Sequence, residues 1–248
     1  MYIIAVAAQK GGTGKTSTAL ALAAGLVRAG RRVLTIDLDQ QCNLSYVVAQ
    51  PSTYTSFSLL SGSPIPSDFP FPDTPCGRVI VAEPRLMQLD NRAHALRPFD
   101  KALLTTGVEW VILDCPPNLG PVTQVALASA THALIPVLPS VLSLQALSQM
   151  LKTIADVRLR FNQDLSIAGI VLNQYDARRR TVRDLMPYFE RAAEQMGTRL
   201  CDTRIRRCAA IEAAQAARTD IYSYDRSNAA LDFAALTVEL IKIVQHQC

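Results

Sequence analysis

Residues Lys10–Thr16, K-G-G-T-G-K-T, have the composition of a phosphate-binding loop. Glycines let the backbone turn its N–H groups toward an anion, and a helix starting at the loop adds the positive end of its dipole. We expect Lys15 to neutralise β- and γ-phosphate oxygens and the Thr16 hydroxyl to bind Mg²⁺. The strict pattern G-x-x-x-x-G-K-[ST] is not met, because Gln9 stands at its first position and Lys10 adds a second lysine.

Two aspartates follow the next apolar run, in the stretch T-I-D-L-D-Q-Q-C-N. Asp37 and Asp39 are two residues apart, so at the end of a strand they can point the same way. Beside a triphosphate, one carboxylate can hold Mg²⁺ or its waters while the other orients the attacking water. The alternative is an acidic loop at a strand end.

A third acidic position ends the apolar run in E-W-V-I-L-D-C-P-P-N-L-G. Asp114 is placed to support Mg²⁺ through a water molecule, and the two prolines after Cys115 end the strand abruptly. Cysteine is a poor ligand for a hard cation, so Cys115 is not expected to bind Mg²⁺.

Composition limits the class of protein. The chain has 248 residues, 49% of them hydrophobic and 19% charged, which argues against disorder. No apolar run reaches the length of a membrane span, and the apolar N-terminus lacks the basic region of a signal peptide. Six scattered cysteines without a C-x-x-C pair indicate reduced thiols. We therefore expect a cytoplasmic protein with no stable membrane anchor.

Short apolar runs alternate with helical periodicity along the chain. Strands are predicted at 2–7, 32–36, 78–82, 110–113, 133–138 and 167–172, and helices at 15–29, 86–104, 143–160, 181–196 and 230–245. This alternation predicts one α/β domain over 1–248, with a twisted, mostly parallel sheet and helices on both faces. Six of the fourteen prolines lie within 50–77, so we expect a loop insertion there with at most one helical turn, at 57–60.

The three motifs, in this order, resemble the deviant-Walker ATPases of the ParA/MinD family. The family loop K-G-G-x-G-K-[ST] matches Lys10–Thr16 in full, so Gln9 is not a lost glycine. I-D-L-D-Q-Q-C-N resembles the family's D-x-D-P-Q-G-N, with Gln40 and Cys42 replacing proline and glycine. V-I-L-D-C-P-P-N-L-G resembles the ParA signature D-C-P-P-S-L-G, with Asn118 for serine. The resemblance covers essentially the whole chain and implies a P-loop NTPase fold.

The resemblance also implies roles for individual residues. Lys10 is similar to the signature lysine that reaches the partner's nucleotide in an ATP-sandwich dimer, which makes it catalytic together with Lys15 and Asp39. Asp39 is similar to the aspartate that orients the hydrolytic water, with Thr16, Asp37 and Asp114 as the magnesium residues. Asn173 resembles an adenine-contacting asparagine; the alternative is an ordinary cap at the end of its strand. The full set implied for ATP is Lys10, Gly11, Gly12, Thr13, Gly14, Lys15, Thr16, Ser17 and Asn173.

Arginine is concentrated late in the chain. Residues 176–207 hold nine arginines and five acids, a surplus equal to the chain's whole net charge of +4. Members of the ParA family bind DNA without sequence preference, and arginines neutralise phosphates in such binding. Arg206 replaces the proline of the family's I-P-R motif, so residue-level correspondence is loose. The candidate DNA residues are Arg178, Arg179, Arg180, Arg183, Arg206 and Arg207; the alternative is a solvated helical face.

We therefore expect a partition ATPase that uses ATP and Mg²⁺, forms a homodimer, binds DNA on the nucleoid and hydrolyses ATP slowly until a ParB-like adaptor stimulates it. The loop begins so early that no DNA-reading helix-turn-helix is expected before it. An ATP switch that positions a protein assembly is the main alternative, and a metabolic ATPase or amidoligase is another. The cysteines do not match the cluster ligands of the related nitrogenase iron protein, which argues against a redox role.

Overall fold

The computed structural model describes residues 1–48, 52–66, 69 and 73–246. Its centre is a seven-stranded sheet in the order β3-β4-β2-β5-β1-β6-β7. The strands are β1 (Tyr2–Val6), β2 (Val33–Asp37), β3 (Asp73–Thr74), β4 (Gly77–Ile80), β5 (Trp110–Asp114), β6 (His132–Val137) and β7 (Ser166–Leu172). Six of them pair in parallel, and the short β3 runs antiparallel to β4 at the sheet edge. The predicted α/β fold with a mostly parallel sheet is confirmed.

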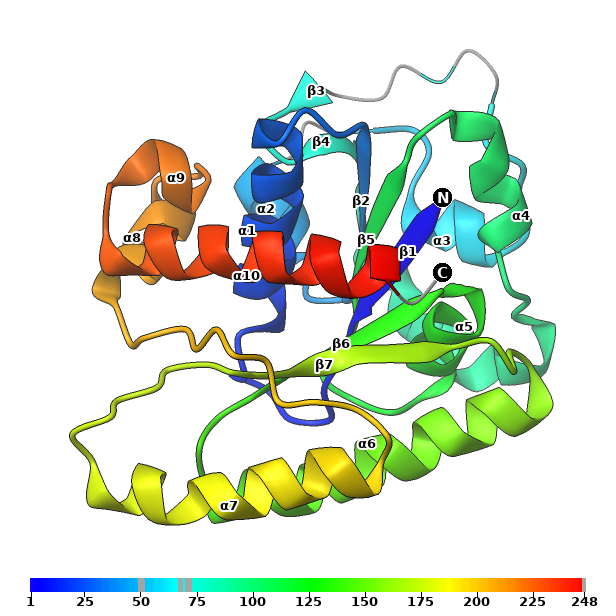
Figure 1. Ribbon diagram of the computed structural model, residues 1–248. Helices are drawn as coiled ribbons and strands as arrows, with labels where there is room; N and C mark the ends of the chain where they lie inside the picture. Colours follow the sequence, from blue (N-terminus) through cyan, green and yellow to red (C-terminus); the bar gives the residue numbers. More distant parts are fainter. Residues whose placement is uncertain (49–51, 67–68, 70–72, 247–248) are drawn as a thin grey trace.

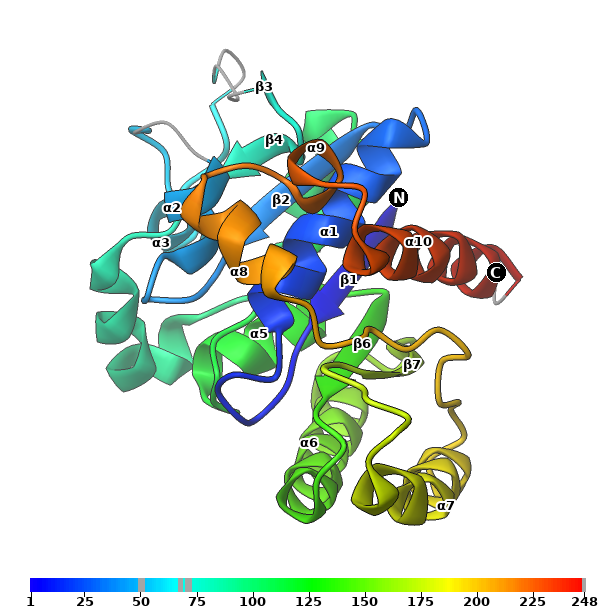
Figure 2. The ribbon, with the colours of Figure 1, turned by 90° about the vertical axis from the view of Figure 1, so that its left-hand side faces the viewer.

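Helices cover both faces of this sheet (Figures 1 and 2). The longer ones are α1 (Lys15–Arg28), α5 (Pro121–Ser129), α6 (Val141–Arg160), α7 (Arg180–Gln195), α8 (Ala209–Ala216) and α10 (Asn228–His246). The shorter ones are α2 (Asn43–Val48), α3 (Ser56–Leu60), α4 (Asp100–Leu103) and α9 (Ile221–Tyr224), with 3₁₀ segments η1 (Pro84–Ala95) and η2 (Leu104–Thr106). Within the described residues, no helix is long and apolar enough to cross a membrane.

The core divides into two layers because side chains alternate along each strand. On β1, Ile3 and Ala5 belong to the cluster that packs against α5, α6 and α7, whereas Ile4 and Val6 belong to the cluster beneath α1 and α10. Burial on both faces explains why the strands read as nearly continuous apolar runs. Because these strands run parallel, their carboxyl ends lie at the same edge of the sheet, with Asp37 opposite Asp114.

The predicted helix at 86–104 is wrong. A 3₁₀ segment covers Pro84–Ala95, and a separate short helix begins at Asp100. Pro98 lies between them, where it lacks an N–H to donate and disfavours helical geometry at Arg97.

The proline-rich stretch follows the prediction where it is described. The expected turn at 57–60 is the helix α3, whose cap residue Thr55 accepts a hydrogen bond from the Ser58 N–H. β3 also falls in this stretch, as half of a short hairpin with β4. Part of the predicted insertion, at 50–51, 67–68 and 70–72, lies outside the described residues.

Candidate nucleotide site

The glycine loop connects β1 to α1 at the carboxyl edge of the sheet. Gly12 and Gly14 have φ angles of 72° and 86°, in the left-handed region that favours glycine. Gly14 is the cap residue of α1, and no side chain caps that end. The free N–H groups of the first turn of α1 are therefore available to an anion.

The two lysines of the loop differ in environment. Lys15 is buried, and burial lowers the pKa of its ammonium group, while the carboxylates of Asp114 and Asp39 offset part of that shift. Its Nζ donates to the Lys10 carbonyl oxygen at 3.2 Å. Lys10 itself is exposed. The loop thus keeps one lysine inside the site and presents the other to the surface.

Strand pairing brings the three predicted aspartates to one place. In the parallel register, Asp114 of β5 lies opposite Asp37 of β2 on one side and Val6 of β1, just before the loop, on the other. Asp37, Asp39 and Asp114 are all buried. The sequence prediction that these carboxylates meet beside the glycine loop agrees with this arrangement.

Asp37 is fully engaged by hydrogen bonds. Its Oδ2 accepts from the Ser45 N–H at 2.9 Å and the Ser45 Oγ at 2.7 Å, and its Oδ1 accepts from the Asp39 N–H at 3.0 Å. Burial nevertheless raises the pKa of this carboxyl to about 6. Asp37 therefore fixes the loop that carries Asp39 and the start of α2.

Asp114 has the opposite character. Neither of its buried oxygens has a hydrogen-bond partner of standard geometry. Burial and the neighbouring Asp37 carboxylate raise the pKa of Asp114 well above its ordinary value, and the nearby Thr16 hydroxyl and Lys15 ammonium offset part of that shift. A buried carboxylate without partners is costly unless a cation or donor meets it. Asp39 is less isolated, because its Oδ1 accepts from the Gln41 N–H at 3.0 Å and it borders the pocket.

These oxygen groups fit Mg²⁺. The Thr16 hydroxyl and the Asp114 carboxylate are hard oxygen ligands of the kind this ion takes together with phosphate oxygens and water. Within the described residues, no group of three or more His, Cys, Asp or Glu side chains could hold a metal by itself. The site therefore suits an ion that arrives with a phosphate ligand.

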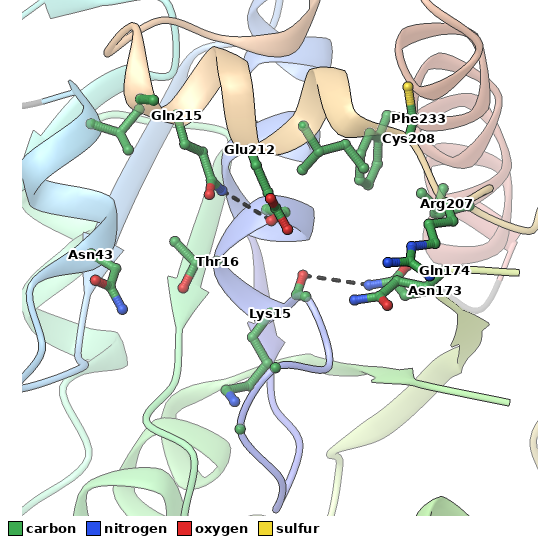
Figure 3. Close-up of a pocket in the computed structure, with 18 of the residues that line it drawn as sticks. Lys15, Thr16, Asn43, Asn173, Gln174, Arg207, Cys208, Glu212, Gln215 and Phe233 are labelled. Atoms are coloured by element: carbon green, nitrogen blue, oxygen red, sulfur yellow. Dashed lines mark hydrogen bonds between the residues drawn. The ribbon is translucent and has the colours of Figure 1, made fainter. Parts of the chain in front are cut away.

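A pocket of about 700 Å³ opens above the glycine loop, within the size range of small-molecule sites. Figure 3 shows Glu212 and Gln215 of α8 on the side facing Lys15 and Thr16, with Asn43 of α2 flanking them. Gln215 Nε2 donates to Ser17 Oγ at 2.9 Å. Sequence reasoning missed the α8 wall, because this segment has no apolar periodicity that marks it.

Asn173 lies beside the loop, just after β7. Its Nδ2 donates to the Thr13 carbonyl at 2.8 Å and to Thr18 Oγ1 at 3.1 Å. A Cβ at position 14 would collide with this amide, so both this close contact and the φ angle require glycine there. Asn173 also borders the pocket, where its buried Oδ1 has no hydrogen-bond partner. The residue holds the loop in place and presents an acceptor to the pocket.

The six candidate DNA arginines do not share one environment. Arg178, Arg179, Arg180 and Arg183 are exposed at and before the start of α7. Arg178 pairs with Asp176 at 3.0 Å and Arg180 with Asp184 at 3.7 Å, both in solvent. Arg178 and Arg206 both form two-pronged ion pairs, but Arg206 is only half-exposed and its partner, Asp232 of α10, is largely buried. Arg207 borders the nucleotide pocket. Arg206 and Arg207 therefore lie in a different environment from the four exposed arginines near the start of α7.

Comparison with known proteins identifies the family. Residues 4–220 match the CobQ/CobB/MinD/ParA nucleotide binding domain. The chain belongs to this family. It is 36% identical over 206 residues to the chromosome partitioning protein ParA of Myxococcus xanthus, covering 76% of this chain and 72% of that protein. It is 37% identical over 179 residues to the chromosome-partitioning ATPase Soj of Thermus thermophilus, covering 71% and 70%.

Solved structures of the CobQ/CobB/MinD/ParA family have the same fold. Cobyrinic acid a,c-diamide synthase from Mycobacterium smegmatis, solved with ADP and magnesium, is 27% identical, with a TM-score of 0.80 over 99% of this chain and 96% of that one. An ATP complex of McdA from Cyanothece is 19% identical, with a TM-score of 0.82 over 97% and 96%. The second likeness concerns the fold alone.

Proposed function

We propose that the chain is a ParA-type partition ATPase. It binds ATP with Mg²⁺, forms a nucleotide-sandwich homodimer, binds DNA without sequence preference and hydrolyses ATP slowly until an adaptor protein stimulates it. The observation that carries this proposal is the pairing of a buried Lys15 with an exposed Lys10 on one glycine loop that faces three buried carboxylates. The relatives named for chromosome partition support the biological setting.

The roles follow from the geometry. The loop N–H groups and Lys15 bind the phosphates, and the Thr16 hydroxyl and Asp114 hold Mg²⁺, which when bound offsets charge on the phosphate oxygens. Asp39, at the pocket wall, orients the attacking water. Asp37 keeps Asp39 in position through its bonds to the Asp39 and Ser45 N–H groups. We assign Asp37 this positioning role and place direct support of the metal on Thr16 and Asp114.

The dimer gives Lys10 its function. Lys10 contributes only its carbonyl oxygen to its own site, where Lys15 and Thr13 donate to it. Its exposed ammonium group is free to reach the nucleotide of a second chain, as an arginine finger supplied in trans does. The phosphate charge in the partner site is the reason that the dimer depends on ATP.

Sedimentation of the full chain tests this proposal. With ATP and Mg²⁺ the wild type should dimerise, and Lys10→Ala should keep nucleotide affinity yet lose the dimer or its hydrolysis. Asp39→Ala is the matched control, because it should retain ATP and accumulate as a dimer that does not turn over. A Lys10→Ala variant that dimerises and hydrolyses ATP normally would contradict the role of Lys10.

DNA binding is the remaining part of the proposal. Four exposed arginines within 178–183 supply a phosphate-binding surface, and two of them have acidic neighbours only in solvent, where such pairs are weak. Arg206 and Arg207 are less suited to DNA, because Arg206 is half-exposed and held by the largely buried Asp232, and Arg207 borders the pocket. We therefore narrow the DNA surface to Arg178, Arg179, Arg180 and Arg183. If the chain instead positions a protein assembly, this surface will not bind DNA.

A further inference from the structure

An arginine occupies a backbone position that usually belongs to glycine. Helix α8 ends with a pair of hydrogen bonds, from the Arg218 N–H to Gln215 O and from the Thr219 N–H to Ala214 O, both 3.0 Å. This is the Schellman arrangement, whose left-handed residue is most often glycine. Arg218 fills it with a φ of 53°. A side chain at such a position carries backbone strain, so its contacts are informative.

The Arg218 side chain reaches a second helix. Its guanidinium lies 5.0 Å from the ring centroid of Tyr46, within the range of a cation–π interaction. Tyr46 belongs to α2 and is 62% exposed, so the core does not hold its ring in place. The contact therefore ties the end of α8 to α2 at the surface.

Both helices form walls of the nucleotide pocket. Tyr46 and Asn43 border it from α2, and Glu212 and Gln215 border it from α8. Figure 3 shows Asn43 on one side of the pocket and Glu212 and Gln215 on α8 above it. α8 is anchored lightly: Ala214 is its one fully buried residue, and Ala210 and Ile211 pack partly buried against the core. Gln215 connects it to Ser17 at the base of the pocket. The Arg218–Tyr46 contact provides a second connection, from the end of α8 to α2.

We propose that Arg218 and Tyr46 form a clasp that holds α8 against α2 over the bound nucleotide and slows its release. The clasp also connects to Asp39. Ser45, next to Tyr46, donates to Asp37, and Asp37 in turn accepts a hydrogen bond from the Asp39 N–H. The inference rests on the proposed binding of a nucleotide in this pocket.

Release of a fluorescent nucleotide tests the clasp. The full chain is loaded with N-methylanthraniloyl-ADP and Mg²⁺ and chased with excess ADP in a stopped-flow instrument. Arg218→Gly removes the guanidinium and relieves the backbone strain, so it should not lower Tm, yet it should speed release about two- to fivefold. Tyr46→Ala should give a similar increase. The double variant should be no faster than either single variant, because both remove the same contact.

Arg226→Gly is the matched control, because it removes the same charge from an exposed position after α9 that has no contact with Tyr46. It should release nucleotide at the wild-type rate. Equal acceleration by Arg226→Gly, wild-type release by Arg218→Gly, or additive effects in the double variant would each overturn the clasp and leave the proposed function intact. A wild-type chain that binds no adenine nucleotide would instead overturn the proposed function and the clasp with it.

Discussion

At the scale of single residues, the site combines groups that water would normally separate. Lys15 and Asp114 are both buried, and burial lowers the pKa of the lysine and raises that of the carboxyl. Each charge makes the other less costly, but the Asp114 oxygens have no hydrogen-bond partner of standard geometry. Asp114 therefore destabilises the chain without nucleotide, and we infer that it is retained because it binds Mg²⁺ with the nucleotide.

Asp114→Asn should consequently stabilise the chain without nucleotide while weakening Mg²⁺-dependent nucleotide binding. The pKa of Asp114 is raised in the fold, so its favourable contribution is present at low pH and is lost as the pH rises from about 4 toward the folded-state pKa. The Tm of Asp114→Asn should therefore exceed that of the wild type by an amount that grows over that range. In a chain of this size, each 1 kcal/mol of added stability raises Tm by about 2–4 °C.

Differential scanning calorimetry between pH 4.5 and 7.5, without nucleotide, measures this difference in Tm. Asn118→Asp is the control, because it adds a carboxyl to the half-buried loop after the same strand, where the Gly120 N–H can still donate to the Oδ1 of residue 118. A Tm of Asp114→Asn that lies below the wild type at every pH would show that Asp114 is satisfied in the free chain.

Asn173 shows where sequence reasoning reaches its limit at this scale. The resemblance assigns it to adenine, whereas its amide nitrogen donates to the carbonyl of Thr13 in the loop and to the hydroxyl of Thr18 in α1. The two roles are compatible, because its free oxygen borders the pocket. A contact 160 residues apart in the chain leaves no local pattern that could predict it.

Asn173→Ala separates the two roles. If Asn173 holds the loop, affinity for inorganic tripolyphosphate should fall along with affinity for ATP, by about 5- to 30-fold, as expected for one or two buried hydrogen bonds. If it contacts only adenine, tripolyphosphate should bind as tightly as to the wild type. Isothermal titration with both ligands measures the difference, and Asn162→Ala, which loses amide bonds far from the loop, is the control.

At the scale of elements, prediction succeeded where burial fixes the pattern. The six parallel strands are apolar on both faces and end in turns, so their positions could be read within two residues. The long helices α1, α6, α7 and α10 bury one face and were also predicted. Their placement explains why the motifs at the strand ends could be expected to meet.

Elements that depend on tertiary contacts were missed or misread. α8 buries one residue and is held by side chains of α1 and α2, so its own sequence carries no apolar stripe. α5 is apolar almost all round and short, which hides its period. The periodicity at 86–104 suggested one helix, but Pro98 divides it. The wall opposite the phosphate loop was therefore the part of the site that sequence could not supply.

At the scale of the whole molecule, the net positive charge is concentrated in one segment. The surplus of positive charge lies within residues 176–207, and its most exposed part is the start of α7, outside the nucleotide pocket. Arg206 and Arg207 leave this surface for α10 and the pocket. In the proposed function, the nucleotide and DNA surfaces are therefore separate, and dimerisation through Lys10 would double the proposed DNA surface.

Changing Arg178, Arg179 and Arg180 to Glu should remove DNA binding while leaving ATP binding unchanged. The matched control is Lys101→Glu, Lys152→Glu and Lys242→Glu, which changes net charge equally at exposed positions on α4, α6 and α10. That control should lower affinity only slightly, because its charges lie outside the proposed surface. Equal losses in both triple variants would indicate a diffuse charge effect.

The most direct test of the proposed function is binding of the wild-type chain to a non-specific DNA duplex across a salt series, with ATP and with ADP. We predict tight binding with ATP that weakens steeply as salt rises, in proportion to the phosphates neutralised, and much weaker binding with ADP. Binding that is equally weak with both nucleotides at every salt concentration would contradict a DNA-partition role.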